Sequence, residues 1–370
     1  MKIGIVTFYA TNNCGAMLQC YALYETIRRL CPKAEIHVLD FLHGTRRTPP
    51  SLLNSFKQSY RKSHSVPKAV ILAAQAAGLR LLAKRDSCFQ EFIEHFTNLD
   101  ASACLTDNHC LDCSGYDILI TGSDQVFAGC QPYFYLDSTQ KEPLSKVAYA
   151  PSFGNVDNLP AEKHQWVADK LSSFHALSCR ETDGSALLER LMGRPCPQVL
   201  DPTMLLTPDD WRSIAKRPGG VEDGDFVFSY ELWRCPQTQA TARRAARELG
   251  VPLIRAKYFN EALRFYNAIG PREFIWLIAH AKHVVTHSFH GSVFSLLFGT
   301  PFHVIATKAP QSRITTLLSM VNQEDRRIHN SSEWDAARPQ PALETIHGHI
   351  LPHKQQSLEY LSAALRDLGC

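Results

Sequence analysis

The sequence lacks several features that mark large classes of proteins. It contains no apolar run long enough to cross a bilayer, no internal repeat and no low-complexity tract. The opening segment Met-Lys-Ile-Gly-Ile-Val-Thr-Phe has only a short apolar run with no small-residue cleavage site behind it, which indicates a buried strand rather than a signal peptide. We therefore expect a globular protein that stays in the cytoplasm.

Strong net charge is also missing, because the formal net charge is only +3, which argues against a general nucleic-acid binder. Acidic residues are absent between Asp40 and Asp86, however, where nine basic residues gather. These are Arg46, Arg47, Lys57, Arg61, Lys62, Lys68, Arg80, Lys84 and Arg85. Segment 41–85 is predicted either to dock peripherally on the inner face of the membrane or to pack on the first domain with its cations solvated.

Neither a metal-binding nor a dinucleotide-binding pattern is complete. Cys104, Cys110 and Cys113 lie near His109, but no second C-x-x-C pair follows at zinc-finger spacing, and no G-x-G-x-x-G occurs. The other cysteines, Cys31 among them, fall mostly in predicted helices or strands, where a thiol behaves as a small hydrophobe. We expect no metal, no cofactor and free thiols rather than disulfides.

What is present is an alternation of short β-like runs with helical patterns, which predicts parallel sheets wrapped by helices. The predicted strands are 2–8, 35–39, 116–121, 146–149, 176–179, 225–231, 252–255, 283–286 and 302–305, and the predicted helices are 15–30, 237–249, 271–281 and 291–298. A Pro/Gly/Asp-rich stretch at 216–225 resembles a linker. The fold class predicted is α/β, with two doubly wound Rossmann-like domains facing a cleft. We assign them to 1–206, with a basic helical insertion at 41–115, and to 207–370, with a closing C-terminal helix.

Polar clusters follow four predicted strands, at the edge where such folds bind ligands. The turn at 9–19 contains Asn13 and Gln19, and its Gly15 opens a helix. Asp124 and Gln125 follow the strand at 116–121, where Asp124 could accept a proton from a hydroxyl. The alternatives are a simple N-capped turn for the first cluster and a structural turn aspartate for the second.

The other two clusters carry a cation and a histidine. Arg180 follows the strand at 176–179 and suits a carboxylate or phosphate, unless it forms a structural ion pair with Glu181. His290 stands at a strand-to-helix turn next to Gly291, where it is a candidate acid or base. His280, His283, His287 and His290 resemble a metal array in spacing, but the β-branched run at 284–286 would point them in different directions.

Taken in order, these clusters resemble the polysaccharide pyruvyl transferase family. The resemblance is carried by 2–4, 13–19, 120–126 (Ile-Thr-Gly-Ser-Asp-Gln-Val), 148–154 (Ala-Tyr-Ala-Pro-Ser-Phe-Gly), 179–181 (Cys-Arg-Glu), 199–203 (Val-Leu-Asp-Pro-Thr) and 288–291 (Ser-Phe-His-Gly). It implies a fold similar to the GT-B glycosyltransferases, with the acceptor on the first domain and the donor on the second. The implied reaction transfers a pyruvyl group from phosphoenolpyruvate to a sugar hydroxyl pair, which forms a ketal.

The resemblance also implies roles for individual residues. The donor would be bound by Arg180, Ser288, Gly291 and Lys308. The acceptor, expected to be a lipid-linked oligosaccharide of capsule or exopolysaccharide synthesis, would be bound by Asn13, Gly15, Gln19 and Gln125. His290 and Asp124 would share the acid and base roles. Many members have Arg-Leu-His where this chain has Ser288-Phe289-His290, so we expect Arg313 or Lys308 to supply the missing positive charge.

Two other functions fit the same residues. A nucleotide-sugar glycosyltransferase on the same kind of fold would use Arg180 and Lys308 to bind a diphosphate. A non-catalytic sugar- or phosphate-binding protein would have no need of His290 for its role.

Overall fold

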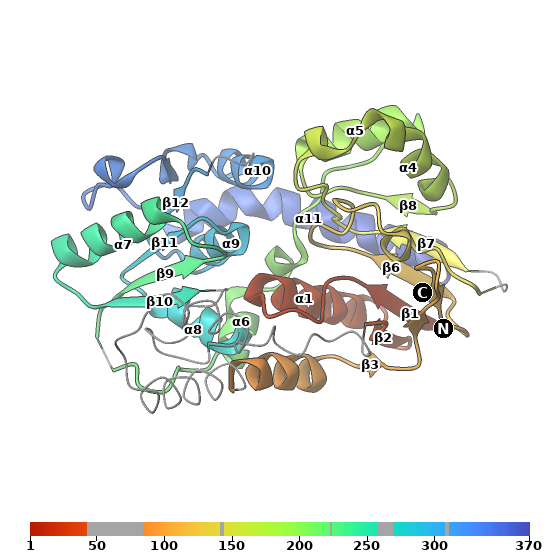
Figure 1. The fold of residues 1–370 in the computed structure, drawn as a ribbon, viewed down its shortest axis with the longest axis horizontal. Helices are drawn as coiled ribbons and strands as arrows, with labels where there is room; N and C mark the ends of the chain where they lie inside the picture. Colours follow the sequence, from red (N-terminus) through yellow and green to blue (C-terminus); the bar gives the residue numbers. More distant parts are fainter. Residues whose placement is uncertain (43–83, 141–143, 223, 258–268, 308–310) are drawn as a thin grey trace, which may run out of the picture.

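The computed structural model describes residues 1–42, 84–140, 144–222, 224–257, 269–307 and 311–370, which form two parallel β-sheets with surrounding helices (Figure 1). Strand order is β3-β2-β1-β6-β7-β8 in the first sheet and β10-β9-β11-β12-β13 in the second. Every strand pairing within these two sheets is parallel. The predicted fold class is confirmed.

The first sheet and its helices come from the first part of the chain. Their bounds are β1 (Lys2–Val6), α1 (Cys14–Leu30), β2 (Glu35–Leu39), β3 (Leu99–Asp100), β6 (Ile118–Thr121), β7 (Ser145–Ala148), α4 (His164–Leu171), β8 (Ala176–Leu177) and α5 (Thr182–Met192). A separate antiparallel pair consists of β4 (Cys104–Leu105) and β5 (Leu111–Asp112). Short 3₁₀ helices are η2 (Pro132–Tyr135), η3 (Val156–Asn158), η4 (Ala161–Lys163) and η5 (Pro202–Met204).

The second sheet and its helices follow. Their bounds are α6 (Pro208–Ile214), β9 (Val227–Glu231), α7 (Pro236–Leu249), β10 (Leu253–Lys257), α8 (Pro271–His280), β11 (His283–Thr286), α9 (Phe289–Phe298), β12 (Phe302–Ile305), α10 (Ser312–Met320), β13 (Arg327–Ile328) and α11 (Leu343–Asp367). The 3₁₀ helices here are η6 (Glu324–Arg326) and η7 (Ser331–Glu333).

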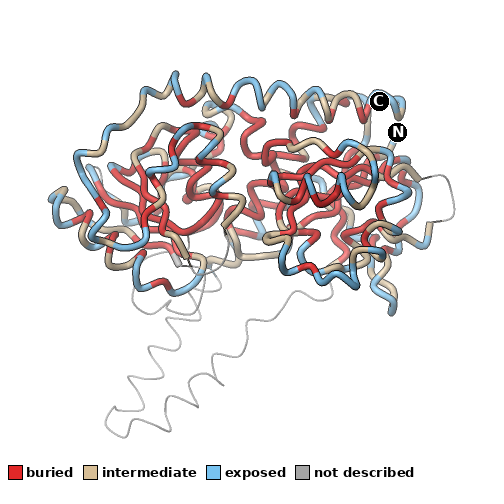
Figure 2. The backbone as a smooth tube through the Cα atoms, turned by 90° about the horizontal axis from the view of Figure 1, so that it is seen from above, coloured by how far each residue is buried: buried red, intermediate tan, exposed pale blue. Residues whose placement is uncertain are grey.

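Helices cover both faces of the second sheet, which explains why its strands are apolar at successive positions. Val227 of β9 packs in one cluster with Ala242 of α7, whereas its neighbour Phe228 packs in another with Phe274 of α8. Successive side chains of a strand point to opposite faces, so α7 and α8 lie on opposite sides of the sheet. In Figure 2 the buried residues lie in the interior of the molecule and the exposed ones toward its outside.

The two sheets fall on either side of the predicted boundary at 206 and 207, but the chain crosses between the domains again near its end. The long helix α11 starts beside the second sheet and runs back along the first (Figure 1). There the Oγ of Ser357 accepts a hydrogen bond from the Leu200 amide at 2.9 Å, and the Tyr360 hydroxyl donates to the Ala148 carbonyl at 3.0 Å. The predicted closing helix therefore joins the domains.

Two expectations are corrected by the structure. The predicted insertion at 41–115 is not helical throughout: residues 84–96 are helical, but β3 extends the first sheet by pairing with β2, and β4 and β5 form a hairpin. Cys31 is not a free thiol, because it forms a disulfide with Cys370, 339 residues away in sequence. Most of the basic segment 41–85 lies outside the described residues. Among the residues described, no helix is both long and apolar enough to span a membrane.

Candidate active site

The strand orders define where ligands bind in this kind of fold. In the first sheet the order reverses at β1, which pairs with both β2 and β6, and in the second it reverses at β9, which pairs with both β10 and β11. Open parallel sheets bind ligands at such points, beyond the carboxyl ends of the strands. The loop after β6 carries Asp124, and the first turns of α1 and α9, which follow β1 and β11, carry Gly15 and His290. The switch points of both sheets therefore contribute predicted site residues.

Arg180, which follows β8, is buried and bound to two carboxylates. Its Nη1 donates to Asp201 Oδ2 at 2.5 Å, and its Nη2 donates to Asp124 Oδ1 at 3.2 Å. Among the described residues, Arg180 forms ion pairs with Asp124 and Asp201 and none with Glu181. The alternative of a structural ion pair with Glu181 is therefore wrong. Glu181 instead accepts a hydrogen bond from the Phe153 amide at 2.7 Å through its Oε1.

Asp201 is a central residue of the site that the sequence interpretation did not select. Its Oδ1 accepts hydrogen bonds from the amide and hydroxyl of Thr203, at 3.0 and 2.6 Å, which holds the carboxylate in place. Its Oδ2 accepts from Arg180 and lies 3.5 Å from His290 Nε2. The only sequence signal was the position of Asp201 in the 199–203 motif, since its partners lie far away along the chain.

His290 lies where the two domains touch. It is the second residue of α9, whose first turn is capped by Ser288, the Oγ of which accepts from the Gly291 amide at 3.3 Å. Across the interface, a Cβ added to Gly15 at the start of α1 would lie 2.1 Å from His290 Nδ1. Only glycine fits at position 15, because the imidazole packs directly on the first turn of α1.

A second arginine reaches the same place from α10. Arg313 Nη1 lies 3.6 Å from Asp124 Oδ1. With the Gln125 amide oriented to satisfy both groups, its oxygen accepts from Arg313 at 2.8 and 3.2 Å. The Phe289 ring lies beneath both guanidinium groups, 4.6 Å from Arg180 Cζ and 5.8 Å from Arg313 Cζ. The two cations thus share contact with one aromatic ring, Phe289, and with one carboxylate, Asp124.

Burial and mutual charge set the protonation of these groups. Burial alone would raise the pKa of Asp124, but Arg180, His290 and Arg313 hold it below its usual value. Asp201 behaves in the same way, since burial is outweighed by His290 and Arg180 and its pKa is lowered. Burial together with the like charge of Arg180 lowers the pKa of Arg313 to about 10. Burial raises the pKa of Glu181. The site therefore keeps two ionised carboxylates beside two guanidinium groups at neutral pH.

Several predicted binding residues use their side chains within the protein. Asn13 Oδ1 caps α1 by accepting from the amides of Gly15 and Ala16. Gln19 is buried, donates to Thr7 Oγ1 at 2.9 Å and accepts from the Ser123 amide at 3.0 Å, so it shapes the loop after β6. The predicted contacts of Asn13 and Gln19 with the acceptor remain predictions. Lys308 lies outside the described residues.

Gly291 has a role in packing, and the four histidines of the metal-like spacing do not form a metal site within the described residues. A Cβ on Gly291 would lie 2.7 Å from Thr286 Oγ1, so this glycine allows α9 to start close to β11. The four histidines do not converge, and the residues described contain no cluster of three or more His, Cys, Asp or Glu side chains able to hold a metal ion. His287 accepts the Leu232 amide at 3.0 Å with Nε2, and burial lowers its pKa to about 4.

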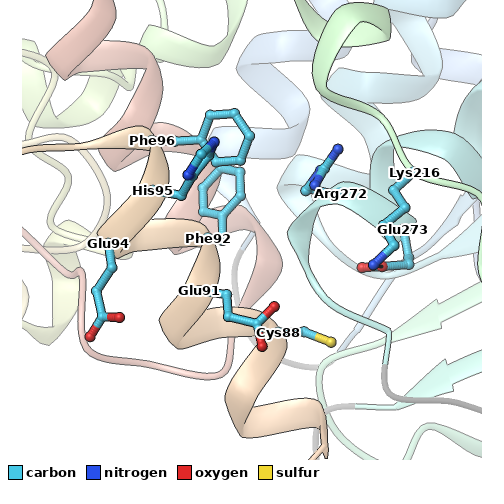
Figure 3. A pocket seen from close by; sticks show the side chains of 9 residues that line it. All are labelled: Cys88, Glu91, Phe92, Glu94, His95, Phe96, Lys216, Arg272 and Glu273. Carbon is cyan, nitrogen blue, oxygen red and sulfur yellow. Dashed lines mark ion pairs between the residues drawn. The ribbon is translucent and has the colours of Figure 1, made fainter.

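A separate cavity of about 470 Å³ lies between the helical residues 84–96 and the start of α8 (Figure 3). Its lining residues are Cys88, Glu91, Phe92, Glu94, His95, Phe96, Lys216, Arg272 and Glu273. Glu273 accepts from the Gly270 amide at 3.1 Å and Arg272 Nε donates to the Ile214 carbonyl at 2.8 Å, so these two side chains also secure α8. None of the predicted site residues lines this cavity.

Comparisons with known proteins give distant structural neighbours and one family. UDP-GlcNAc 2-epimerase from Methanocaldococcus jannaschii is similar at 11% identity and a TM-score of 0.44, over 95% of this chain and 92% of that one. Heptosyltransferase WaaC from E. coli, solved with ADP, is similar at 11% identity and a TM-score of 0.41, over 95% and 100%. Likenesses this remote carry no weight for function, and no curated protein matches the sequence.

The family described as polysaccharide pyruvyl transferase matches residues 13–308. The match includes the loops after β6, β8 and β11, from which Asp124, Arg180 and His290 reach the site. It also spans Asp201, whereas Arg313 lies beyond its end. Because the match covers most of the chain and includes nearly the whole site, this protein belongs to the polysaccharide pyruvyl transferase family.

Proposed function

We propose that the protein transfers the pyruvyl group of phosphoenolpyruvate to two hydroxyls of a sugar, which forms a pyruvate ketal and releases phosphate. The observation that carries this proposal is the convergence of Arg180, Arg313, His290 and Asp124 at the switch points of the two sheets. Family membership supports the transfer of a pyruvyl group to a polysaccharide. The identity of the donor as phosphoenolpyruvate and of the product as a ketal is proposed in addition to what family membership supports.

Donor binding is assigned to the cations. Phosphoenolpyruvate is a small, multiply charged anion, so it needs more than one cationic group in a site with little water. Arg180 and Arg313 supply two, and Ser288, Gly291 and Lys308 are proposed as further contacts. An anion bound at Arg180 Nη2 would compete with Asp124, which now accepts from that nitrogen at 3.2 Å. Donor binding would therefore release Asp124 for the acceptor hydroxyl.

The reaction needs one proton delivered to carbon and one removed from each attacking hydroxyl. Protonation of the methylene carbon makes the methyl group, and the first sugar oxygen bonds to the neighbouring carbon. The bond from that carbon to the phosphate oxygen then breaks, and phosphate leaves with the electron pair and takes up one proton. The second hydroxyl adds to the same carbon and closes the ketal. Atoms and charges balance without a redox or metal cofactor.

The surroundings of the two titratable side chains favour one division of labour. Asp124 is kept ionised by Arg180, His290 and Arg313, which suits the removal of a proton from a hydroxyl. His290 Nε2 lies 3.5 Å from the Asp201 carboxylate, which would orient the ring for delivery of a proton to carbon. We therefore assign the acid role to His290 and the base role to Asp124.

The acceptor is proposed to be a lipid-linked oligosaccharide used for capsule or exopolysaccharide, modified in the cytoplasm at the inner face of the membrane. Asn13, Gly15 and Gln125 lie on the first-domain side of the site. Peripheral contact through segment 41–85 is tested by flotation with anionic vesicles. Equal flotation of the wild type and a variant with Arg61, Lys62, Lys84 and Arg85 changed to Gln would refute it.

The function is tested by incubating the enzyme with phosphoenolpyruvate and a lipid-linked oligosaccharide pool and following both products. We expect phosphate release together with a mass increase of one pyruvate ketal on the oligosaccharide. The same pool with a panel of nucleotide sugars tests the rival glycosyltransferase. Transfer of a hexose from a nucleotide sugar, with no reaction of phosphoenolpyruvate, would replace the proposal by that rival.

A further inference from the structure

Trp233 is a large aromatic side chain left exposed in the loop after β9. It is 48% exposed, whereas the other large apolar residues with comparable exposure, Met1 and Leu351, are a terminal residue and a residue of α11. Large aromatic rings are usually mostly buried because their apolar area is costly to leave in water. A half-exposed indole in a loop that follows a central strand therefore calls for a functional explanation.

The strand register places Trp233 at the crevice edge of the second sheet. Tyr230 of β9 lies opposite Thr286 of β11 in the parallel ladder. Trp233 is thus three residues beyond the paired end of β9, and His290 is four residues beyond the paired end of β11. Both follow the two strands that flank the switch point, where loops diverge and ligands bind.

The indole is held in place by His287. The two rings lie 4.4 Å apart between centroids, and His287 Nε2 accepts from the amides of Leu232 at 3.0 Å and Trp233 at 3.4 Å. On its other side the His287 Nδ1 bonds to Thr238 Oγ1 at 3.1 Å. Because Nε2 accepts two amides, Nδ1 carries the proton and the ring is neutral. The position of Trp233 is therefore set before any ligand arrives, which lowers the entropic cost of binding.

The remaining interactions of Trp233 are few. In the described part of the chain its Nε1 donates no hydrogen bond, and its ring contacts that of His287. An indole of this kind offers a flat apolar face and one hydrogen-bond donor. That pairing matches a pyranose ring, which has an apolar face of C–H groups and hydroxyls at its edge.

We propose that Trp233 forms a sugar-binding subsite, on which a pyranose ring of the acceptor stacks while the reacting hydroxyl pair lies near His290. This inference rests on the proposed function for the identity of the ligand as acceptor. It assigns His287 as the residue that positions the Trp233 ring. It also gives the second domain a share in acceptor binding. The family resemblance, by contrast, implies an acceptor on the first domain.

Binding is tested without turnover, by acrylamide quenching of tryptophan fluorescence in the full-length protein. The probes are methyl glycosides of glucose, galactose, mannose and N-acetylglucosamine, with UDP as the nucleotide probe. We expect at least one glycoside to reduce quenching in the wild type and to have no effect in Trp233→Phe, since the other tryptophans are half-buried or buried. No protection by any glycoside, or protection by UDP alone, would overturn the proposal.

Steady-state kinetics then ask whether the bound sugar is the acceptor. Trp233→Ala should raise the KM for the lipid-linked acceptor about tenfold and leave the KM for phosphoenolpyruvate unchanged, and Trp233→Phe should restore most of the loss. Trp276→Phe is the matched control, because Trp276 also stacks on a histidine, His280, but at the carboxyl end of α8, away from the crevice. It should behave as wild type.

The two proposals fail in different ways. Transfer of pyruvate with an unchanged acceptor KM in Trp233→Ala would refute the subsite and leave the proposed function standing. Protection of Trp233 by a glycoside in a protein that does not consume phosphoenolpyruvate would keep the sugar subsite and refute the proposed function.

Discussion

His283 and His290 lie seven residues apart, at the start of β11 and in the first turn of α9, and both are buried, but their surroundings are opposite. His290 Nε2 faces the carboxylate of Asp201 at 3.5 Å. His283 Nε2 instead faces His303 Nδ1 at 2.9 Å and accepts from Trp334 Nε1 at 3.3 Å. The charged side chains that act on the pKa values of that pair are cations, Arg326 and Arg338.

Under the proposed function, this difference separates a catalytic histidine, His290, from a structural one, His283. A carboxylate beside an imidazole stabilises the charged ring that forms when the ring takes up a proton, whereas two imidazoles among arginines disfavour it. Burial, together with these arginines, lowers the pKa of His283 and of His303 to about 3. The His283 pair therefore stays neutral and packs, while His290 has the surroundings of an acid–base group. The following variants test this contrast.

The largest effect is expected for His290→Ala. Turnover of phosphoenolpyruvate should fall by about a hundredfold or more, the usual scale for a lost acid–base group. The measurement is phosphate release by protein whose circular dichroism matches the wild type. His280→Ala, which removes an exposed histidine before β11, is the control and should keep normal turnover. Near-normal rates in folded His290→Ala would end the assignment.

Asp201→Asn should sharpen the contrast, since it removes the charge that distinguishes the two histidines. We expect kcat to fall at least about tenfold, because His290 loses its orienting carboxylate, with little change in the acceptor KM. Thr203→Ala removes one hydrogen bond to Asp201 without removing the charge, and it should cost less. A normal kcat in Asp201→Asn would show that Asp201 serves only the fold.

Arg180→Lys keeps the positive charge and loses the planar fork that spans Asp124 and Asp201. We expect the KM for phosphoenolpyruvate to rise about tenfold, because a lysine cannot hold two anions in parallel. Kinetics with the acceptor at saturation measure this change. A rise in the acceptor KM alone would place Arg180 on the wrong side of the crevice.

The smallest effect on turnover is expected for changes to the buried pair of His283 and His303, which should instead alter the pH dependence of stability. Its folded pKa lies below the unfolded value of about 6.5, so the unfolded chain binds more protons in that range. The contribution of the neutral pair to the free energy of unfolding is complete above about pH 6.5. It is lost as the pH falls toward 3, by up to about 1.4 kcal/mol per pH unit for each histidine. Urea unfolding at several pH values measures this slope. His303→Asn should flatten it, and His329→Gln, at an exposed site, should not.

Much of the local structure could be predicted from the sequence. The strands at 35–39, 283–286 and 302–305 have the predicted bounds, and α1, α7, α8 and α9 begin within two residues of the predicted starts. Each of these depends on signals within a few residues, such as the Asn13 cap or the β-branched run before His287. The four polar clusters were found for the same reason, because they follow strands directly.

The sequence by itself thus determined the α/β class, the placement of Asp124, Arg180 and His290 after strands, and the resemblance to the family that the chain proves to match. Only the tertiary structure decided the pairing of Arg180 with Asp201 rather than Glu181, the contact of Gly15 with His290, and the exposure of Trp233. These depend on strand order and on the meeting of two domains, which join residues far apart in the chain. No local pattern encodes such distances.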